Sequence, residues 1–181
     1  MARDRGRGRP VSAAGLKLSV FFGERDRDGG RFLADRIIAE LERAGVAAAI
    51  LMRGVEGFGI KHRRRTDRLL TLSEDLPVIA IGVGEPGPVE AAAGRIGTID
   101  FDGLVTLERL QFLGRSGEPV PARAGEEAKL SVHLGRGRRI DGEPAHRSLL
   151  SRLRGAGVEG GAVLLGVDGI LGGARRRAGF F

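Results

Sequence analysis

The feature that most constrains the fold of this chain is an internal repeat at an offset of 112 residues. A match that keeps register over about fifty positions without a gap is not expected by chance, and it indicates one supersecondary unit used twice. The second copy ends at Phe181, soon after its version of an arginine run, so it is shorter than the first. The recurring stretches are Lys17-Leu18-Ser19-Val20 with Lys129-Leu130-Ser131-Val132, Ala44-Gly45-Val46 with Ala156-Gly157-Val158, Gly54-Val55-Glu56-Gly57 with Gly166-Val167-Asp168-Gly169, and Arg63-Arg64-Arg65 with Arg175-Arg176-Arg177.

The first copy predicts an ordered succession of strands and helices. Period-two alternation and β-branched apolar runs indicate strands, and apolar residues at helical spacing indicate helices. Asp28 is the predicted N-cap of the first helix, and Gly45 stands where a C-terminal glycine belongs. The expected order is strand 16–22, helix 30–44, strand 46–53, strand 76–83, helix 86–96 and strand 104–113.

This order predicts a ferredoxin-like split βαβ domain, an α+β architecture in which an antiparallel sheet carries two helices on one face. Such a sheet has exposed edges that favour pairing between subunits, so we expect an oligomer. The expected organisation is a disordered basic tail over 1–14, a domain over 15–114, a polar linker over 115–127 and a partial, degenerate repeat over 128–181.

The second copy contains the counterparts of the first strand, the first helix and the second strand only. In a ferredoxin-like sheet those two strands are not neighbours, because the third strand lies between them. We therefore expect the half-copy to be poorly stable alone. Three outcomes are open: it borrows a strand from another chain, packs on the first domain, or stays partly disordered.

Residues 54–77 form the candidate functional stretch. Gly54, Gly57 and Gly59 open it, and glycines allow close approach of the backbone to a partner. A cationic cluster, Lys61-His62-Arg63-Arg64-Arg65, follows and suits an anionic ligand such as phosphate. A solvated hairpin loop with a charged tip explains the same pattern equally well.

Enzymatic chemistry has little support in the sequence. The chain has no cysteine, and its three histidines, His62, His133 and His146, make a weak metal site. Residues 82–87 match the pattern G-x-G-x-x-G, but they are better explained as a strand-to-helix turn. The arginine-rich start does not resemble a secretory signal, and we expect a soluble, cytoplasmic protein without enzymatic activity.

The formal net charge of +7 and a pI of about 11.1 raise nucleic acid as a partner. A four-stranded sheet that binds RNA uses aromatic side chains on its face. This chain has eight Phe but no Tyr and no Trp, and the predicted third strand has no aromatic residue. We expect no specific nucleic-acid partner, and a nonspecific nucleic-acid-binding protein remains one alternative.

Three motifs of the first copy together resemble a family of PII-like proteins whose genes often lie beside fluoride-channel genes. The resemblance covers 16–113 well and the half-copy loosely. It implies a PII-like, ferredoxin-like fold, a homotrimer, and small anionic ligands, usually adenine nucleotides, between subunits. The motifs are Lys17-Leu18-Ser19-Val20-Phe21-Phe22-Gly23-Glu24, then Arg53-Gly54-Val55-Glu56-Gly57-Phe58-Gly59 followed by Lys61-His62, and Leu72-Ser73-Glu74-Asp75-Leu76-Pro77.

The resemblance also implies that the long loop after the second strand contacts the ligand and reports occupancy to a partner, often a transporter. We therefore expect a regulatory protein that signals through residues 54–75. A partner-binding module without a small ligand is the other alternative. No cofactor is expected besides a possible adenine nucleotide, and no metal. The predicted ligand-binding residues are Gly57, Phe58, Gly59, Lys61, His62, Arg63 and Arg65.

The half-copy divides the residues of this stretch into those that it retains and those that it replaces. It retains Gly166, Gly169 and the arginines, but Gly173 and Ala174 replace Lys61 and His62. This difference predicts that Gly54 and Gly57 serve the fold and that 58–62 serves function.

Overall fold

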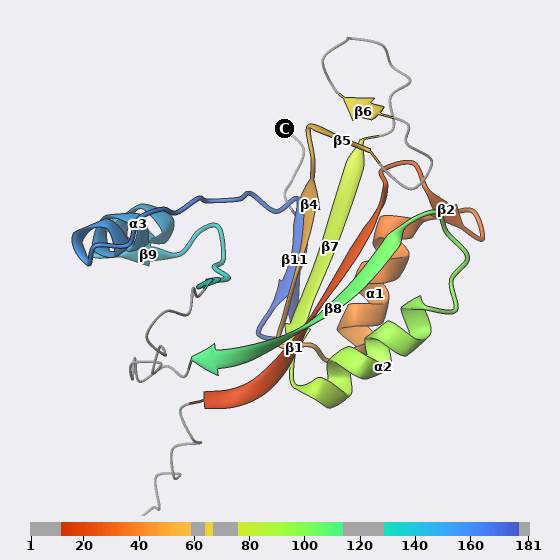
Figure 1. The fold of residues 1–181 in the computed structure, drawn as a ribbon, viewed down its shortest axis with the longest axis horizontal. Coiled ribbons are helices and arrows are strands. Elements are labelled where there is room, and N and C mark those ends of the chain that lie inside the picture. The colour runs from red at the N-terminus through yellow and green to blue at the C-terminus, as the bar shows by residue number, and fades with distance from the viewer. Residues whose placement is uncertain (1–11, 59–63, 67–75, 114–128, 178–181) are drawn as a thin grey trace, which may run out of the picture.

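The computed structural model describes residues 12–58, 64–66, 76–113 and 129–177 (Figure 1). Within these residues the main sheet has six strands in the order β12-β11-β4-β7-β1-β8. Four of them belong to the first copy: β1 (Ser12–Gly23), β4 (Ala48–Arg53), β7 (Pro77–Gly84) and β8 (Leu104–Leu113). They are antiparallel, and the order β4-β7-β1-β8 is that of a ferredoxin-like fold, which confirms the predicted architecture.

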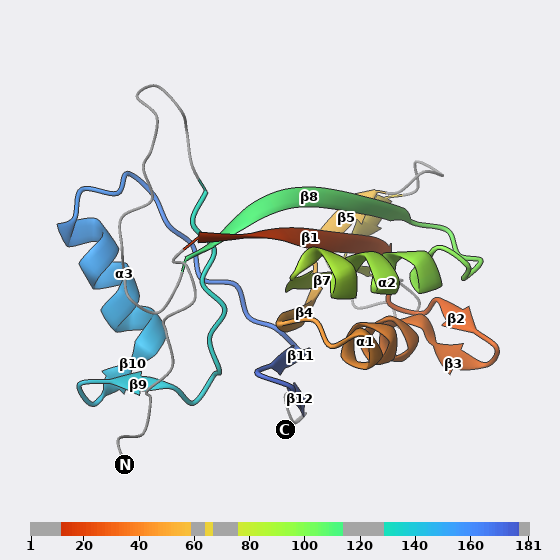
Figure 2. The same cartoon turned by 90° about the horizontal axis from the view of Figure 1, so that it is seen from below.

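Strand β1 lies at the centre of the first copy because it pairs with β7 on one side and with β8 on the other. Its alternating residues Leu18, Val20 and Phe22 are buried. The strand begins at Ser12, so residues 12–14 are part of the sheet rather than of the expected tail. Helices α1 (Leu33–Ala44) and α2 (Pro86–Ile96) cover the face on which these side chains lie, as Figure 2 shows.

The two helices differ in how well their ends were predicted. The bounds of α2 are as expected, and α1 ends at Gly45, whose φ of 73° is left-handed. The predicted N-cap Asp28 was wrong. It lies in a short hairpin of β2 (Arg27–Asp28) and β3 (Arg31–Phe32), and Phe32 precedes the helix without a side-chain cap.

A buried carboxylate joins the two helices. Glu40 of α1 is 2% exposed, and Arg95 of α2 donates to it from Nε at 2.8 Å. Arg43 donates to the same carboxylate at 2.9 Å, and the Nε of Arg36 lies 3.4 Å from it. The charge of Glu40 is therefore compensated, as burial of a carboxylate requires.

The half-copy repeats the helical part of the first copy but not its sheet. Hairpin β9 (Arg139–Ile140) and β10 (Glu143–Pro144) lies 112 residues after β2 and β3, and α3 (Ala145–Gly155) lies 112 residues after the start of α1. Residues 129–134 and 160–165, the counterparts of strands β1 and β4, are not strands. In the first copy both of these strands pair with β7, and the described residues of the half-copy contain no counterpart of that strand.

The half-copy packs on the first domain through a second hairpin, β11 (Asp168–Leu171) and β12 (Ala174–Arg177). Strand β11 pairs antiparallel with β4, from Asp168 opposite Leu51 to Leu171 opposite Ala48. This is one of the three outcomes left open by the sequence. No helix in the described part of the chain is long and apolar enough to cross a membrane.

Candidate functional site

The candidate loop 54–77 is fixed where it leaves and rejoins the sheet. Its first amide, the N–H of Gly54, donates to the carbonyl oxygen of Pro77 at 2.7 Å. Beside it, Arg53 pairs with Glu24 at 2.9 Å, and the N–H of Glu24 donates to Leu76 O at 2.8 Å. The loop therefore connects β4 and β7 through a closed base at one end of the sheet (Figure 1).

Gly54 is required by this base. A Cβ atom at Gly54 would lie 2.9 Å from Cγ of Pro77, closer than side chains approach one another. The expectation that Gly54 serves the fold is therefore confirmed.

Above the base the chain forms a small hairpin of β5 (Glu56–Phe58) and β6 (Arg64–Thr66). Gly57 lies opposite Arg65, and Phe58 lies opposite Arg64. The structure thus brings Gly57, Phe58 and Arg65 of the predicted set together as backbone neighbours. Gly59, Lys61, His62 and Arg63 fall in 59–63, outside the described residues, and their assignment stays a prediction.

The hairpin of the half-copy, β11–β12, is the counterpart of β5–β6. Its two strands are joined by a shorter turn. Gly172 and Gly173, with φ of 59° and 77°, form a two-residue turn between Leu171 and Ala174. Such a turn needs positive φ at both central residues, which glycine adopts without strain. The first copy has Ile60 and Lys61 at these positions. The replacement of Lys61 by Gly173 therefore has a structural cause.

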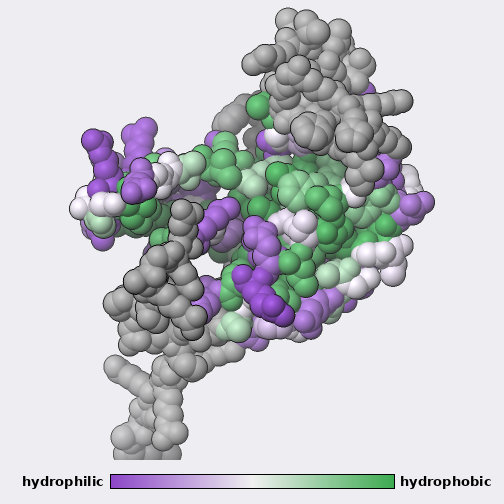
Figure 3. Space-filling model, in the orientation of Figure 1, coloured by the Kyte–Doolittle hydropathy of each residue, from purple (hydrophilic) through white to green (hydrophobic). Residues whose placement is uncertain are grey.

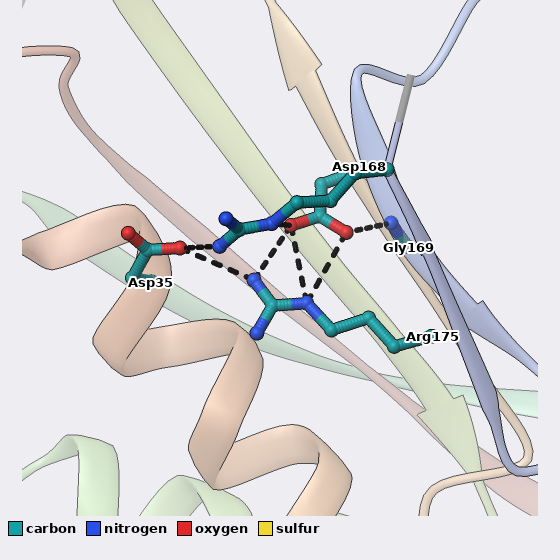
Figure 4. A network of polar contacts seen from close by, with 5 residues as sticks. Asp35, Asp168, Gly169 and Arg175 are labelled. Carbon is teal, nitrogen blue, oxygen red and sulfur yellow. Dashed lines mark hydrogen bonds and ion pairs between the residues drawn. The ribbon is translucent and has the colours of Figure 1, made fainter. Parts of the chain in front are cut away.

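Two arginines of β12 hold this hairpin in place through carboxylates (Figure 4). Asp168 is 9% exposed, and Arg175 donates to it from Nη2 at 2.6 Å while Arg177 donates from Nε at 3.0 Å. Both arginines also pair with Asp35 in the first turn of α1, Arg175 at 3.2 Å. The network joins the half-copy to the first domain.

The geometry of this network shifts the pKa of two of its members, Asp168 and Arg175. Burial alone would raise the pKa of Asp168, but the hydrogen bonds from Arg175, the N–H of Gly169 and Arg177 hold the pKa below its ordinary value. The hydrogen bond to Asp168 raises the pKa of Arg175. Two guanidinium groups thus face two carboxylates, and the charges cancel. Within the described residues, this cluster is a structural contact and has no excess charge for an anion.

The contacts of Arg175 and Arg177 with Asp168 and Asp35, which we call the clamp, were not predicted from the sequence, although one signal was available. Asp168 stands where the first copy has Glu56, so each hairpin carries an acid seven residues before an arginine. Arg175 and Arg177 are the counterparts of Arg63 and Arg65. The partner across the domain, Asp35, is 140 residues before Arg175 and gives no local pattern.

The remaining candidate motifs have simpler explanations. A Cβ atom at Gly82 would lie 2.5 Å from Cδ2 of Leu41, and one at Gly84 would lie 3.2 Å from the N of Ala47, so the G-x-G-x-x-G match reflects close packing before α2. His133 is half-buried, and burial together with the charge of Lys17 lowers its pKa. The described residues include no group of three or more His, Asp or Glu side chains placed to hold a metal ion.

Comparison with known proteins relates both copies to one family. The model of the family DUF190, described as "Uncharacterized ACR, COG1993", matches residues 15–112 and again 127–181. This match spans most of the chain and confirms the resemblance that the motifs indicated. The second match falls on the half-copy, in agreement with the repeat at an offset of 112.

Solved structures of one PII-like protein are also similar. CPII, a nitrogen regulatory PII-like protein from Thiomonas intermedia K12 bound to ADP, AMP and bicarbonate, is 18% identical, with 57% of this chain and 92% of that chain covered and a TM-score of 0.40. Its complex with ADP and bicarbonate has the same identity and coverage with a TM-score of 0.38, and its apo form is 15% identical over 56% and 94%, with a TM-score of 0.36. TM-scores this low carry no argument for the fold. The fold is therefore assigned from the strand order of the chain itself.

Proposed function

This chain belongs to the DUF190 family, and from that premise we propose that it is a PII-like regulatory protein without enzymatic activity. It binds a small anion, an adenine nucleotide above all, between the subunits of a cytoplasmic homotrimer. Residues 54–75 respond to the ligand and contact a protein partner, for which the resemblance implies a transporter.

The closed base of the loop is the observation that carries this proposal. The contacts Gly54–Pro77 and Arg53–Glu24 tie the loop to β4, β7 and the end of β1. A ligand bound at the loop therefore acts on strands in the middle of the sheet. Binding residues are often carried on loops that a rigid scaffold positions in this way.

The predicted residues have distinct roles in this proposal. Gly57 and Gly59 allow the backbone to approach the ligand, and Phe58 supplies an apolar contact between them. Lys61, His62, Arg63 and Arg65 meet phosphate oxygens or an acidic surface of the partner. Arg65 lies opposite Gly57 in the β5–β6 pair, which supports a shared site for these two residues.

Calorimetric titration of the full chain with ATP, ADP, AMP and cyclic AMP tests the ligand. The variant Arg63→Ala/Arg65→Ala should weaken binding at least about tenfold, because a hydrogen bond to a charged group contributes about 1.5–3 kcal/mol. The matched control is Arg176→Ala, in the arginine run of the other copy and exposed. The ligand proposal fails if no nucleotide binds below the millimolar range, and the loop assignment fails if the double variant binds like the control.

A partner-binding module without a small ligand is favoured by one observation, the excess of seven positive charges. Capture of an acidic partner in the absence of nucleotide would support it. A steep salt dependence with a generic oligonucleotide would instead support nonspecific nucleic-acid binding.

A further inference from the structure

The first strand of the repeat is buried in one copy and exposed in the other. Leu18, Val20 and Phe22 are 0%, 0% and 4% exposed, whereas their counterparts Leu130, Val132 and Leu134 are 55%, 47% and 42% exposed. The half-copy keeps the period-two alternation of a strand, yet residues 129–134 pair with no other strand among the described residues. These side chains are suited to a sheet that the half-copy does not provide.

The sheet has one edge that matches this segment. Strand β8 ends the order and pairs only with β1 among the described strands. Leu104, Val105 and Leu107 of β8 are 53%, 39% and 50% exposed. Figure 3 shows that apolar residues gather on the visible face of the sheet, where β8 lies in front. An exposed, apolar edge strand of ten residues is a template for another strand.

The opposite edge of the sheet is protected against the addition of a further strand. It is formed by β12, whose sequence Ala174-Arg175-Arg176-Arg177 places charged side chains along the edge. Charged residues on an edge strand disfavour the addition of a further strand. Strand addition is therefore directed to β8.

Charge complementarity sets a register on β8. In the first copy Lys17 donates to Glu108 at 2.7 Å, and Leu18 and Val20 lie opposite Leu107 and Val105. Residues 129–134 repeat this stretch. An antiparallel strand on the outer edge in the equivalent register has Lys129 beside Glu108, Leu130 beside Leu107 and Val132 beside Val105. The exposed apolar side chains of both strands then cover one another.

We propose that residues 129–134 of one chain add as a strand to the outer edge of β8 in a second copy of this chain. Within one chain the half-copy is anchored to β4, on the other side of the sheet, by β11 and by the contacts of Arg175 and Arg177 with Asp35. Among the described strands, neither residues 129–134 nor the outer edge of β8 has a strand partner, so in this arrangement each chain gives one strand and receives one. This interface goes beyond the proposed function, because it does not involve residues 54–75.

Cysteine pairing tests the interface directly, because the chain has no native cysteine. A size-tagged chain with Val132→Cys is mixed with an untagged chain with Val105→Cys in a thiol–disulfide buffer without nucleotide. Directly opposite residues of an antiparallel pair have Cα atoms about 4.5–5.5 Å apart, which lies within the Cα range of a disulfide. The expected product is the mixed disulfide of the two chains. Val163→Cys replaces Val132→Cys in the control, since Val163 is equally exposed in the half-copy at 51%.

Two outcomes overturn the proposal. One is an equal yield of mixed disulfide from Val163→Cys and Val132→Cys. The other is a chain with Val105→Cys and Val132→Cys that closes its disulfide only within itself, which would assign the edge to the segment of the same chain. Neither outcome depends on a ligand, so failure here leaves the nucleotide titration unaffected.

A second measurement uses amide hydrogen exchange. Amides of β8 should become at least about tenfold better protected when the wild-type chain is concentrated, and Leu130→Glu/Val132→Glu should abolish this gain. Both substitutions fall on exposed side chains, so the single chain keeps its fold. Protection of β8 that does not depend on concentration, or that survives the double substitution, would contradict strand addition by a second copy.

Discussion

The hairpins β5–β6 and β11–β12 descend from the same stretch of sequence and have different positions in the molecule. The first stands on a closed loop base at the end of the sheet, whereas the second lies along the edge of β4. Gly169, the counterpart of Gly57, would place a Cβ atom 2.5 Å from the carbonyl oxygen of Ala49. The second hairpin therefore uses its glycine to reach another strand.

The different positions of the two hairpins explain why the half-copy retains some residues and replaces others. Arg175 and Arg177 survive in the half-copy because they bind Asp168 and Asp35, and Gly172-Gly173 replaces the long tip because a tight turn is sufficient there. Retention of the arginines in both copies thus has a structural explanation in one of them. Lys61 and His62, which only the first copy has, stay predicted ligand-binding residues, although the turn at Gly172-Gly173 gives the loss of Lys61 from the half-copy a structural cause.

The largest expected effect comes from Gly169→Leu. Its side chain meets the backbone of β4, so β11 cannot pair with that strand, and we expect a loss of about 3 kcal/mol in the stability of the hairpin contact. Amide exchange in β4 and β11 reports it. The control is Gly160→Ala, where an added Cβ atom meets nothing within 4 Å. Unchanged protection in Gly169→Leu would show that the hairpin is not held by this contact.

Arg175→Ala should destabilise the same contact by about 2 kcal/mol. Asp168 is buried, and a buried carboxylate that loses a charged hydrogen-bond donor loses about 1.5–3 kcal/mol. Arg177 and the N–H of Gly169 still donate to Asp168, which limits the cost. Exchange in β11 and β12 measures the effect, with the exposed Arg176→Ala as control. Equal effects of the two variants would contradict the clamp.

The clamp should also weaken in acid. The pKa of Asp168 is lowered in the folded chain, so the unfolded chain binds the proton more readily. The stabilisation is complete above the ordinary pKa of 3.8 and is lost as the pH falls through the lower pKa of the folded chain. Exchange in β11 followed from pH 6 downwards should therefore show the loss below about pH 4. Asp168→Asn should lack this step, and a step of the same size in that variant would assign it to other groups.

The sequence predicted those parts of the fold whose signals are local. The bounds of α2 and β8 follow from apolar periodicity and from Pro86 at the helix start, and Gly45 ends α1 as expected. Asp28 failed as an N-cap because Gly29 and Gly30, both with positive φ, turn the chain back into a hairpin before the helix. A turn of two residues competes with a cap over the same few positions.

The position of the second hairpin could not be predicted in this way. Its partner strand β4 is more than a hundred residues earlier, and its pairing depends on β4 having a free edge, which only the folded sheet defines. For the candidate site, the sequence located the loop, and the structure added the pairing of Gly57 with Arg65. The roles of Lys61 and His62, which lie outside the described residues, stay predictions.

The smallest expected effect is an exchange of one residue between the hairpins. Gly173→Lys gives the half-copy the lysine of the first copy, at a φ of 77° that costs a residue with a side chain about 1–2 kcal/mol. For the reverse change, Lys61→Gly, we expect a stability change within about 0.5 kcal/mol together with weaker nucleotide binding. Chemical unfolding and calorimetry of the two variants measure both quantities. If Gly173→Lys is neutral and Lys61→Gly binds nucleotide as the wild type does, the division of the repeat into a structural copy and a ligand-binding copy is wrong, because the residue that distinguishes the two hairpins then matters to neither.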